Sequence, residues 1–233
     1  MLIVLNNKCS FKKDEYNNYL NKISKIKTNQ NLVICPSDIY LLQSNKEPLM
    51  LGSQNVSKYE MGPHTGEISA QQLKSLGVKY TIVGHQERRV ELNETKEDIK
   101  QKVKKLIKED IIPIVCVGET NEQRNNDSYI ETLLSELDFV INDFSESEKE
   151  KIIIAYEPIW CIGTECVPDI EYIYKVVSTI KKYYPNNSVL YGGGINDTNI
   201  ESLKTIEDLN GYLLGQISLV PEKIQKFINI LEN

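Results

Sequence analysis

Long hydrophobic runs are missing from this sequence. Its longest apolar stretches, such as 111–117 and 152–156, fall far short of the roughly 18 residues that a membrane span needs. The opening residues Met1–Asn6 carry no basic segment, and their apolar stretch is too short for a signal peptide. We therefore expect a protein that does not cross a bilayer and that resides in the cytoplasm.

An excess of positive charge is missing as well. The chain has 27 Lys and Arg residues against 33 Asp and Glu residues, which gives a net charge of −6. This balance argues against a general attraction for nucleic acid or for anionic membranes. Any anionic ligand therefore has to be held by a local arrangement of groups.

Paired cysteines and linker segments are also absent. The five cysteines are odd in number and show no metal-ligand spacing, which favours reduced thiols over a disulfide framework or a zinc site. No low-complexity or proline-rich segment divides the 233 residues, of which 40% are hydrophobic and 26% charged. We expect one folded domain over residues 1–233, without a metal.

What the sequence does contain is a series of short apolar runs rich in Val and Ile. They are apolar at nearly every position, which is typical of parallel strands buried on both faces. Polar segments with helical spacing lie between them, such as Ser69–Leu76 and Lys96–Lys108. The runs are Leu2–Leu5, Leu32–Cys35, Leu49–Gln54, Tyr80–Val83, Ile112–Val117, Ile152–Tyr156, Ser188–Tyr191 and Gly211–Leu214.

Strands that alternate with helices predict an α/β fold. Eight units in 233 residues average about 29 residues each, close to the ~30 residues of a strand–helix–strand unit. A (β/α)8 TIM barrel needs eight such units, so we expect this fold. An open, doubly wound sheet is the alternative.

Polar residues and glycines follow five of these runs directly. In a barrel of this type the chemistry gathers on the loops after the carboxyl ends of the strands, so these segments should converge at one rim. They are 6–8, 84–89, 157–158, 192–194 and 215–216.

Three of these positions are candidates for chemistry. Glu157 ends a strand, where a carboxylate serves either as a general base or as half of an ion pair. His85 follows Gly84 at the start of a predicted helix, whose N-terminus disfavours a charged imidazole; the alternative is a surface or capping histidine. Lys8 is either a surface lysine or a cation that attracts a phosphate and stabilises an enolate, with Asn6 holding it or the substrate in register.

The glycines after the last two runs are candidates for phosphate binding. Gly192–Gly194 and Gly215 are either simple turn residues or loops whose N–H groups hold a phosphate, as the loops after strands seven and eight of such barrels commonly do. Backbone binding explains how an acidic protein retains an anion.

Taken together, these residues resemble the triosephosphate isomerase family over essentially the whole chain. Two motifs are especially specific: A-Y-E-P-x-W-x-I-G-T, read at 155–164, and G-H-x-E-R-R, read at 84–89. Further matching segments occur in the same order at 6–8, 32–36, 52–56, 65–69, 76–80, 116–119 and 191–193.

The resemblance implies a homodimeric barrel that interconverts dihydroxyacetone phosphate and glyceraldehyde 3-phosphate without cofactor or metal. By this likeness Glu157 is the base that removes a carbon-bound proton, and Lys8 and Asn6 hold the substrate. Glu87 orients Lys8 through an ion pair. His85 is the neutral electrophile, which is a property of the family and not a deduction from these residues.

The resemblance also implies a lid and a subunit contact. Segment 158–166 is similar to the family's mobile lid, in which the Gly163 N–H closes on the phosphate together with Gly193, Gly194, Gly215 and Gln216 of the loops. Thr65 and Glu67 match the loop that reaches into the partner subunit, Thr65 towards Asn6 and Glu67 towards Arg88. His64 is then a loop residue near the interface, and Cys116 a buried thiol under the site.

Several positions depart from the family pattern. Asn7 replaces a common aromatic residue, and Gln86 stands where Ser is expected, from where its amide could still bond Glu157. Glu165 and Cys166 replace a Gly-Lys pair at the far end of the lid. Gly194 stands where the family has a phosphate-binding Ser, and Gln216 replaces a glycine, so its side chain either crowds the phosphate loop or supplies a donor.

The reacting groups are therefore kept while the phosphate-binding groups are altered. Three interpretations remain open: a divergent triosephosphate isomerase, an isomerase of a related four-carbon ketose phosphate, or a barrel that binds a phosphorylated ligand or a protein partner with little turnover.

Overall fold

Eight parallel strands form a closed barrel in the computed structural model, in the order β1 to β8. The structure describes residues 1–126, 128–162, 166–196 and 199–233. The strands are β1 (Leu2–Asn6), β2 (Asn31–Cys35), β3 (Met50–Ser53), β4 (Tyr80–Val83), β5 (Ile112–Val117), β6 (Ile153–Tyr156), β7 (Val189–Tyr191) and β8 (Gly211–Leu214).

The first strand closes the barrel because it pairs on both edges. Leu2 lies opposite Asn31 of β2 and opposite Gly211 of β8, and both pairings are parallel. Every strand therefore has two neighbours, and no sheet edge is left open. The predicted (β/α)8 fold is confirmed, and the open doubly wound sheet is excluded.

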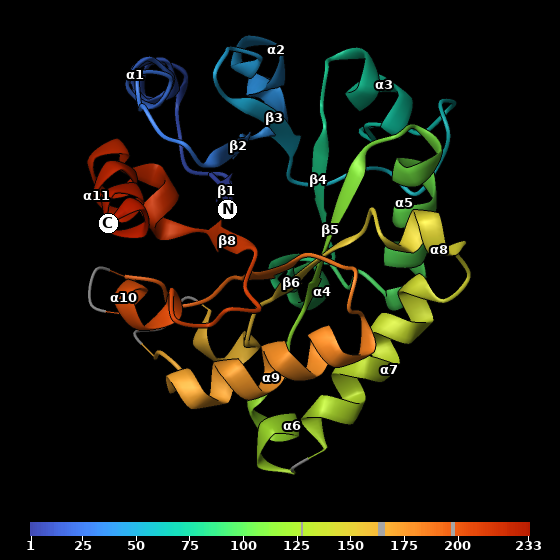
Figure 1. Cartoon of the computed structure of the whole chain (residues 1–233). Coiled ribbons are helices and arrows are strands. Elements are labelled where there is room, and N and C mark those ends of the chain that lie inside the picture. Colours follow the sequence, from blue (N-terminus) through green and yellow to red (C-terminus); the bar gives the residue numbers. More distant parts are fainter. Residues whose placement is uncertain (127, 163–165, 197–198) are drawn as a thin grey trace.

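Helices surround the strands as an outer layer (Figure 1). They are α1 (Lys13–Ile23), α2 (Leu41–Ser44), α3 (Ala70–Ser75), α4 (Gln86–Glu91), α5 (Lys96–Lys108), α6 (Asn121–Asn125), α7 (Tyr129–Ile141), α8 (Glu146–Lys149), α9 (Ile170–Tyr183), α10 (Ile200–Leu203) and α11 (Pro221–Glu232), with the 3₁₀ turns η1 (Asp38–Tyr40), η2 (Ile159–Cys161) and η3 (Gln216–Leu219). None of these helices has both the length and the apolar character needed to cross a membrane, among the residues described.

Helix α5 shows why the polar segments fold as they do. The Thr95 hydroxyl accepts a hydrogen bond from the Asp98 N–H, and the Asp98 carboxylate accepts one from the Thr95 N–H, so the first turn is capped in both directions. Ile99, Val103 and Leu106 then repeat at helical spacing and are buried. The helix thus presents an apolar stripe to the barrel.

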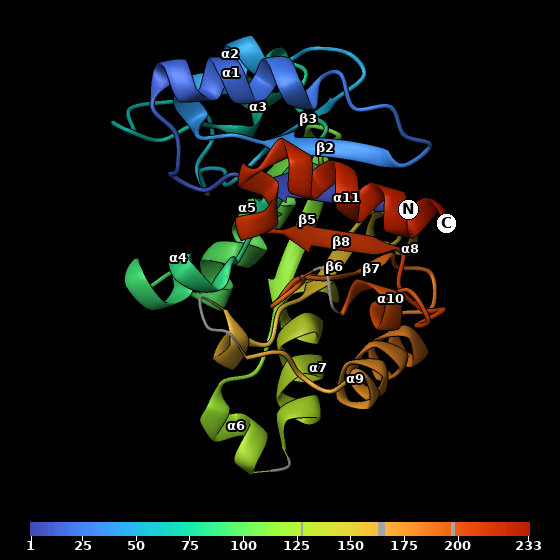
Figure 2. The same cartoon turned by 90° about the vertical axis from the view of Figure 1, so that its left-hand side faces the viewer.

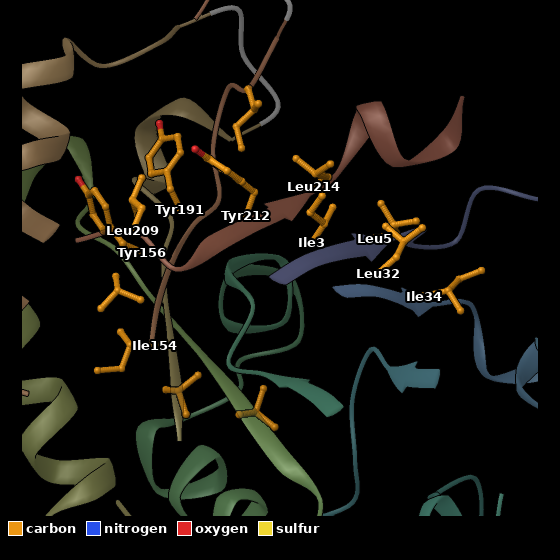
Figure 3. Packing of buried hydrophobic residues seen from close by; sticks show 14 of the residues in the cluster. Ile3, Leu5, Leu32, Ile34, Ile154, Tyr156, Tyr191, Leu209, Tyr212 and Leu214 are labelled. Atoms are coloured by element: carbon orange, nitrogen blue, oxygen red, sulfur yellow. The ribbon is translucent and has the colours of Figure 1, made fainter. Parts of the chain in front are cut away.

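Alternate residues of the strands supply two separate apolar layers. Ile3 and Leu5 of β1 pack in the cluster that contains the buried helix residues, whereas Val4 packs in a second cluster that contains strand residues only. The second cluster therefore fills the barrel interior. Figure 3 shows the outer set, with Tyr156, Tyr191 and Tyr212 projecting from β6, β7 and β8.

The two ends of the barrel differ. The chain termini lie at one end, and α4, which follows the carboxyl end of β4, lies at the opposite end (Figure 2). The loops that carry the candidate residues follow the carboxyl ends of the strands. They therefore share the end away from the termini.

Candidate active site

A cavity of about 110 Å³ lies among the loops that follow the carboxyl ends of the strands. The structure brings the candidate base, the candidate electrophile, the lysine and the glycine loops together around it. Its lining includes Asn6, Lys8, His85, Glu157, Gly193, Gly194, Gly215 and Gln216. Glu87 lines a neighbouring hollow of about 280 Å³ together with Lys8 and His85, and the predicted phosphate contact Gly163 lies outside the described residues.

Lys8 is fixed at its backbone and at its side chain. Its φ of 51° lies in the left-handed region, and its carbonyl oxygen accepts hydrogen bonds from Ser37 Oγ at 2.8 Å and from Gln54 Nε2 at 2.9 Å. Its N–H donates to Asn6 Oδ1 at 3.2 Å, and its Nζ lies 2.5 Å from Glu87 Oε1. The ion pair with Glu87 and the support by Asn6 are thus both present in the geometry.

His85 is the N-cap residue of α4 and is buried. Its Nδ1 accepts a hydrogen bond from the Glu87 N–H at 3.3 Å. A ring that accepts at Nδ1 has its proton on Nε2, and Nε2 lies 3.6 Å from Glu157 Oε1. The imidazole therefore presents an N–H donor to the cavity beside the carboxylate.

Glu157 is held close to two neighbouring strands because glycines make room for it. Its N–H donates to the Val117 carbonyl at 2.8 Å, and a Cβ at Gly118 would lie only 1.7 Å from the Glu157 carbonyl oxygen. A Cβ at Gly192 would lie 2.9 Å from Glu157 Oε1. Only glycine allows these close approaches. This role of Gly118 and Gly192 was not predicted from the sequence.

The Glu157 carboxylate is almost fully buried, with 5% of the residue exposed. Its Oε2 has no hydrogen-bond partner among the described residues. The neighbouring Cys116 thiol is buried, and burial together with the nearby Glu157 charge raises the pKa of that thiol well above its usual value. Cys116 therefore stays protonated beside Glu157, and one oxygen of the buried carboxylate is held by none of the described residues.

A second buried carboxylate, Glu119, anchors the chain just after Glu157. Its Oε1 accepts hydrogen bonds from Trp160 Nε1 at 2.7 Å, Tyr172 OH at 2.9 Å and Tyr156 OH at 3.1 Å. These donors come from η2, α9 and β6, so one oxygen joins three elements. Burial, and secondarily the Glu119 charge, raises the pKa of Tyr156 and Tyr172 above the usual range. This cluster was not predicted from the sequence, in which Glu119 stands out only as part of the matching segment 116–119.

The glycine loops offer main-chain donors to the cavity. No described residue accepts a hydrogen bond from the N–H of Gly194 or of Gly215. Gln216 is exposed at the start of η3 and lines the cavity beside them. These groups can bind an anion, with Lys8 as the cation that lines the same space.

Two departures from the family pattern have clear surroundings. Asn7 is buried, and its Nδ2 donates hydrogen bonds to Tyr19 OH at 3.0 Å and to the Ser218 carbonyl at 3.2 Å. It therefore belongs to a polar network that links the end of β1 to η3, in addition to its packing role. The structure describes both Gln86 and Glu157, and the Gln86 amide makes no hydrogen bond with the Glu157 carboxylate that it was expected to reach.

Of the predicted subunit-contact residues, Arg88 lines the hollow beside the cavity, whereas Thr65 and Glu67 of the same chain line neither space. Thr65 and Glu67 are exposed, and Arg88 Nε instead donates to Glu94 Oε2 at 2.5 Å. Burial alone would raise the pKa of Glu94. The hydrogen bonds and positive charges of Lys102 and Arg88 outweigh this effect, so the net pKa is lowered and the carboxylate stays charged. Among the described residues no group of three His, Cys, Asp or Glu side chains is placed to hold a metal ion.

The chain is similar to proteins of known family over its whole length. The sequence model of the triosephosphate isomerase family matches residues 1–232. A triosephosphate isomerase of Mesomycoplasma hyorhinis is 41% identical, over 89% of this chain and 85% of its own length. One of Orientia tsutsugamushi is 37% identical, over 99% of this chain and 98% of its own length.

Proposed function

Because the chain belongs to the triosephosphate isomerase family and is therefore an aldose–ketose isomerase, we propose that it interconverts dihydroxyacetone phosphate and glyceraldehyde 3-phosphate. The proton moves between adjacent carbons through an enediolate. The observation that carries this proposal is the buried Glu157 carboxylate, which faces the His85 imidazole at 3.6 Å in one small cavity. We expect this activity to serve glycolysis and gluconeogenesis in the cytoplasm.

Glu157 acts as the base. Proton removal next to a carbonyl needs a carboxylate that is poorly hydrated and correctly positioned, and a placed base contributes ~10² to 10⁴-fold to the rate. The burial of Glu157 and its unpartnered Oε2 fit this task. The same oxygen returns the proton to the neighbouring carbon.

His85 and Lys8 stabilise the oxygen on which negative charge develops. The Nε2–H of His85 donates to that oxygen, and Lys8 Nζ, held by Glu87, supplies a positive charge nearby. A placed donor of this kind contributes ~10² to 10³-fold. Asn6 keeps Lys8 in register through its bond to the Lys8 N–H.

The phosphate binds at the glycine loops. The N–H groups of Gly193, Gly194 and Gly215 are its main-chain donors, and the Gln216 amide adds a side-chain donor. Glycine at position 194, in place of the family's serine, does not enlarge the cavity. The Cys166 carbonyl oxygen already occupies the space of a side chain, since it lies 2.7 Å from where a Cβ of residue 194 would be. The backbone thus already fills that space, which favours the three-carbon substrate over a longer one.

The active form is a homodimer. The hollow beside the cavity is lined by Cys9, Asp38, Gln54, Arg88 and Leu92 and is open to solvent in one chain. We expect the Thr65–Glu67 loop of a second copy to occupy it, with Thr65 towards Asn6 and Glu67 towards Arg88. Exposed Ile39, Val90 and Met61 would then be covered.

The test is turnover of the Glu157→Gln variant in both directions. The amide keeps the size of the side chain but cannot take a proton, so the barrier should rise by about 4 kcal/mol, which is about a thousandfold in kcat. Glu97→Gln, an exposed residue of α5, is the matched control and should retain turnover. Wild-type turnover by Glu157→Gln would remove Glu157 from this role.

A comparison of kcat/KM for three-carbon and four-carbon ketose phosphates tests the substrate. A higher value for the four-carbon compound would replace the proposal by its closest alternative. Phosphate binding without turnover of either compound would indicate a binding protein instead.

A further inference from the structure

Arg89 ends the G-H-x-E-R-R motif and has no part in the mechanism or in the subunit contact proposed above. It belongs to α4, but its side chain reaches back to the ends of two strands. Its Nε donates a hydrogen bond to the Gly84 carbonyl at 2.6 Å, and its Nη2 donates one to the Cys116 carbonyl at 2.8 Å. One guanidinium therefore joins the residue after β4 to the end of β5.

The two carbonyls lie where these strands stop pairing. The register between β4 and β5 ends at Val83 opposite Val115. Gly84, the next residue, has a φ of 71°, which ends the extended backbone. A guanidinium carries its N–H donors in a rigid, planar fork, so it can hold two carbonyl groups at a fixed separation. Arg89 thus continues by a side chain the connection that the backbone no longer makes.

Both carbonyls stand next to the backbone of the two reacting groups. The Gly84 carbonyl belongs to the peptide bond that leads into His85. The Cys116 carbonyl is followed by that of Val117, which accepts the Glu157 N–H at 2.8 Å. A shift of one strand end against the other would therefore change the 3.6 Å between His85 Nε2 and Glu157 Oε1.

Arg89 is itself held tightly. A Cβ at Gly84 would lie 2.9 Å from Arg89 Nη2, so glycine allows the guanidinium to approach the backbone. From the helix layer, Glu136 Oε1 of α7 forms an ion pair with the same nitrogen. The side chains of Arg89 and Glu136 are 18% and 21% exposed, and shielding from water strengthens such a pair.

Gly84 is held on its other side as well. Its N–H donates to Glu94 Oε1 at 3.2 Å, and the Glu94 carboxylate accepts from Arg88 Nε at 2.5 Å. The glycine before His85 is thus fixed at its N–H by Glu94 and at its carbonyl by Arg89. A reacting group that has to be placed within about half an ångström needs supporting bonds of this kind.

We infer that Arg89 is a positioning residue, which sets the separation of the His85 imidazole and the Glu157 carboxylate by fixing the ends of β4 and β5 to each other. Its effect on turnover rests on the proposed isomerase function, whereas its effect on the placement of His85 does not.

The first test is the kinetics of Arg89→Lys. Lysine keeps the positive charge beside Glu136, but its single nitrogen lacks the fork that spans two carbonyls. We expect kcat to fall by about ten- to a hundredfold, since a misplacement of about 1 Å costs rate on this scale. KM and inhibition by inorganic phosphate should change by less than about twofold, because the phosphate is proposed to bind at the loops after β7 and β8.

The matched control is Lys100→Met on α5. Lys100 Nζ forms an ion pair with Asp143 Oδ2 at 2.6 Å, and 14% of its side chain is exposed, close to the 18% of Arg89. This pair lies outside the lining of the cavity, so its loss should leave kcat unchanged.

Glu136→Gln is a milder variant that keeps both carbonyl bonds of Arg89. It removes the charge that holds the guanidinium from outside, and it should lower kcat by about two- to fivefold, the rate equivalent of one partly exposed ion pair.

The second test needs no substrate. The chain has two histidines, so the imidazole signals of His85 and His64 can be resolved in a proton–nitrogen correlation spectrum of the full-length protein and assigned with His64→Gln. In Arg89→Lys the His85 signals should shift, because the peptide bond before this residue is released. Those of His64, in the 57–68 segment, should stay in place.

A kcat of Arg89→Lys within about twofold of that of the unmodified protein would overturn the inference, and so would His85 signals that do not move. If Arg89→Lys does not fold, Glu136→Gln decides: unmoved His85 signals together with an unchanged kcat would refute the role of Arg89. If the unmodified protein does not isomerise triose phosphates at all, the proposed function fails, and the histidine signals then judge the positioning by themselves.

Discussion

At the scale of single residues, His85 carries the most specific expectation. Its Nδ1 is occupied by the Glu87 N–H, so Nε2–H is the one ring donor that faces the cavity. His85→Ala should lower kcat by about 10² to 10³-fold with little change in KM, because the lost bond forms chiefly when charge develops on the substrate oxygen. Steady-state kinetics in both directions measure this. His85→Gln, which keeps an N–H donor, should lose less, and an unchanged kcat in His85→Ala would make the imidazole structural.

Gln216 supplies the second expectation at this scale. It stands where the family has a glycine, is exposed, and lines the cavity beside Gly215. If its amide is a phosphate donor, Gln216→Ala should weaken competitive inhibition by inorganic phosphate by about 1 kcal/mol, the net value of one hydrogen bond. The matched control is Gln225→Ala on α11. Tighter inhibition in Gln216→Ala would mean that the side chain crowds the loop instead.

Gly194 shows where the structure changes an expectation from the sequence. From the sequence alone, a serine at 194 should simply add a phosphate donor. In the structure its Cβ would lie 2.7 Å from the Cys166 carbonyl oxygen and 3.2 Å from Val167 Cγ2. Gly194→Ser should therefore lower the free energy of unfolding by about 1 to 3 kcal/mol, the usual cost of overpacking. Denaturant titration measures this, and an unchanged free energy of unfolding would show that Cys166 yields without cost.

At the scale of elements, the strands could be predicted closely because they are buried on both faces. The run Tyr80–Val83 matches β4 and the run Ile112–Val117 matches β5, since an uninterrupted apolar run has few other uses in a protein of this composition. Helix α5 was equally predictable from its apolar stripe. The four-residue helices α8 and α10 were not predicted, because four residues are too few to show a helical period.

Helix α5 also carries a prediction about pH. Asp98 accepts hydrogen bonds from Lys58 Nζ at 2.5 Å and from Thr95, and these contacts, the Lys58 bond first, lower its pKa from 3.8 to about 2. Because the folded pKa is lower than the usual value, Asp98 stabilises the protein fully above about pH 4, and this contribution is lost as the pH falls through about 2.

Asp98→Asn should therefore reduce the free energy of unfolding by about 1 kcal/mol near neutral pH, a modest figure because the ion pair is partly exposed. Urea titrations at several pH values should show this difference shrinking below about pH 4. Asp14→Asn, an exposed residue in the first turn of α1, is the control. A difference that stays constant with pH would assign the effect to the helix cap alone.

At the scale of the whole molecule, the sequence could predict the barrel but not the contacts between its loops. Each strand run and each following polar residue is a local signal, and the barrel brings them to one end. By contrast, the convergence of Trp160, Tyr156 and Tyr172 on Glu119 depends on how η2, β6 and α9 pack against the loop after β5. No spacing rule gives those distances, because loop paths are fixed by the tertiary packing around them.

The second copy of the chain is the largest-scale expectation. Five of the exposed large apolar side chains lie on three segments: Ile39 and Leu42 after β2, Met61 in the 57–68 segment, and Val90 and Leu92 on and after α4. Exposed groups of this kind mark interaction surfaces, and Leu92 lines the hollow that we assign to the partner's Thr65–Glu67 loop.

Met61→Asp places a charge in that segment and should therefore separate the subunits. Light scattering on a sizing column should give a mass near 26.7 kDa for the variant, and about twice that value for the unmodified protein. Turnover should fall at least about tenfold, because Lys8 and Asn6 then lose the support of the partner's loop. Tyr183→Asp, an exposed apolar residue on α9, is the matched control and should remain dimeric and active. A Met61→Asp protein that is monomeric and fully active would show that one chain contains the complete site, whereas a retained dimer would place the interface elsewhere.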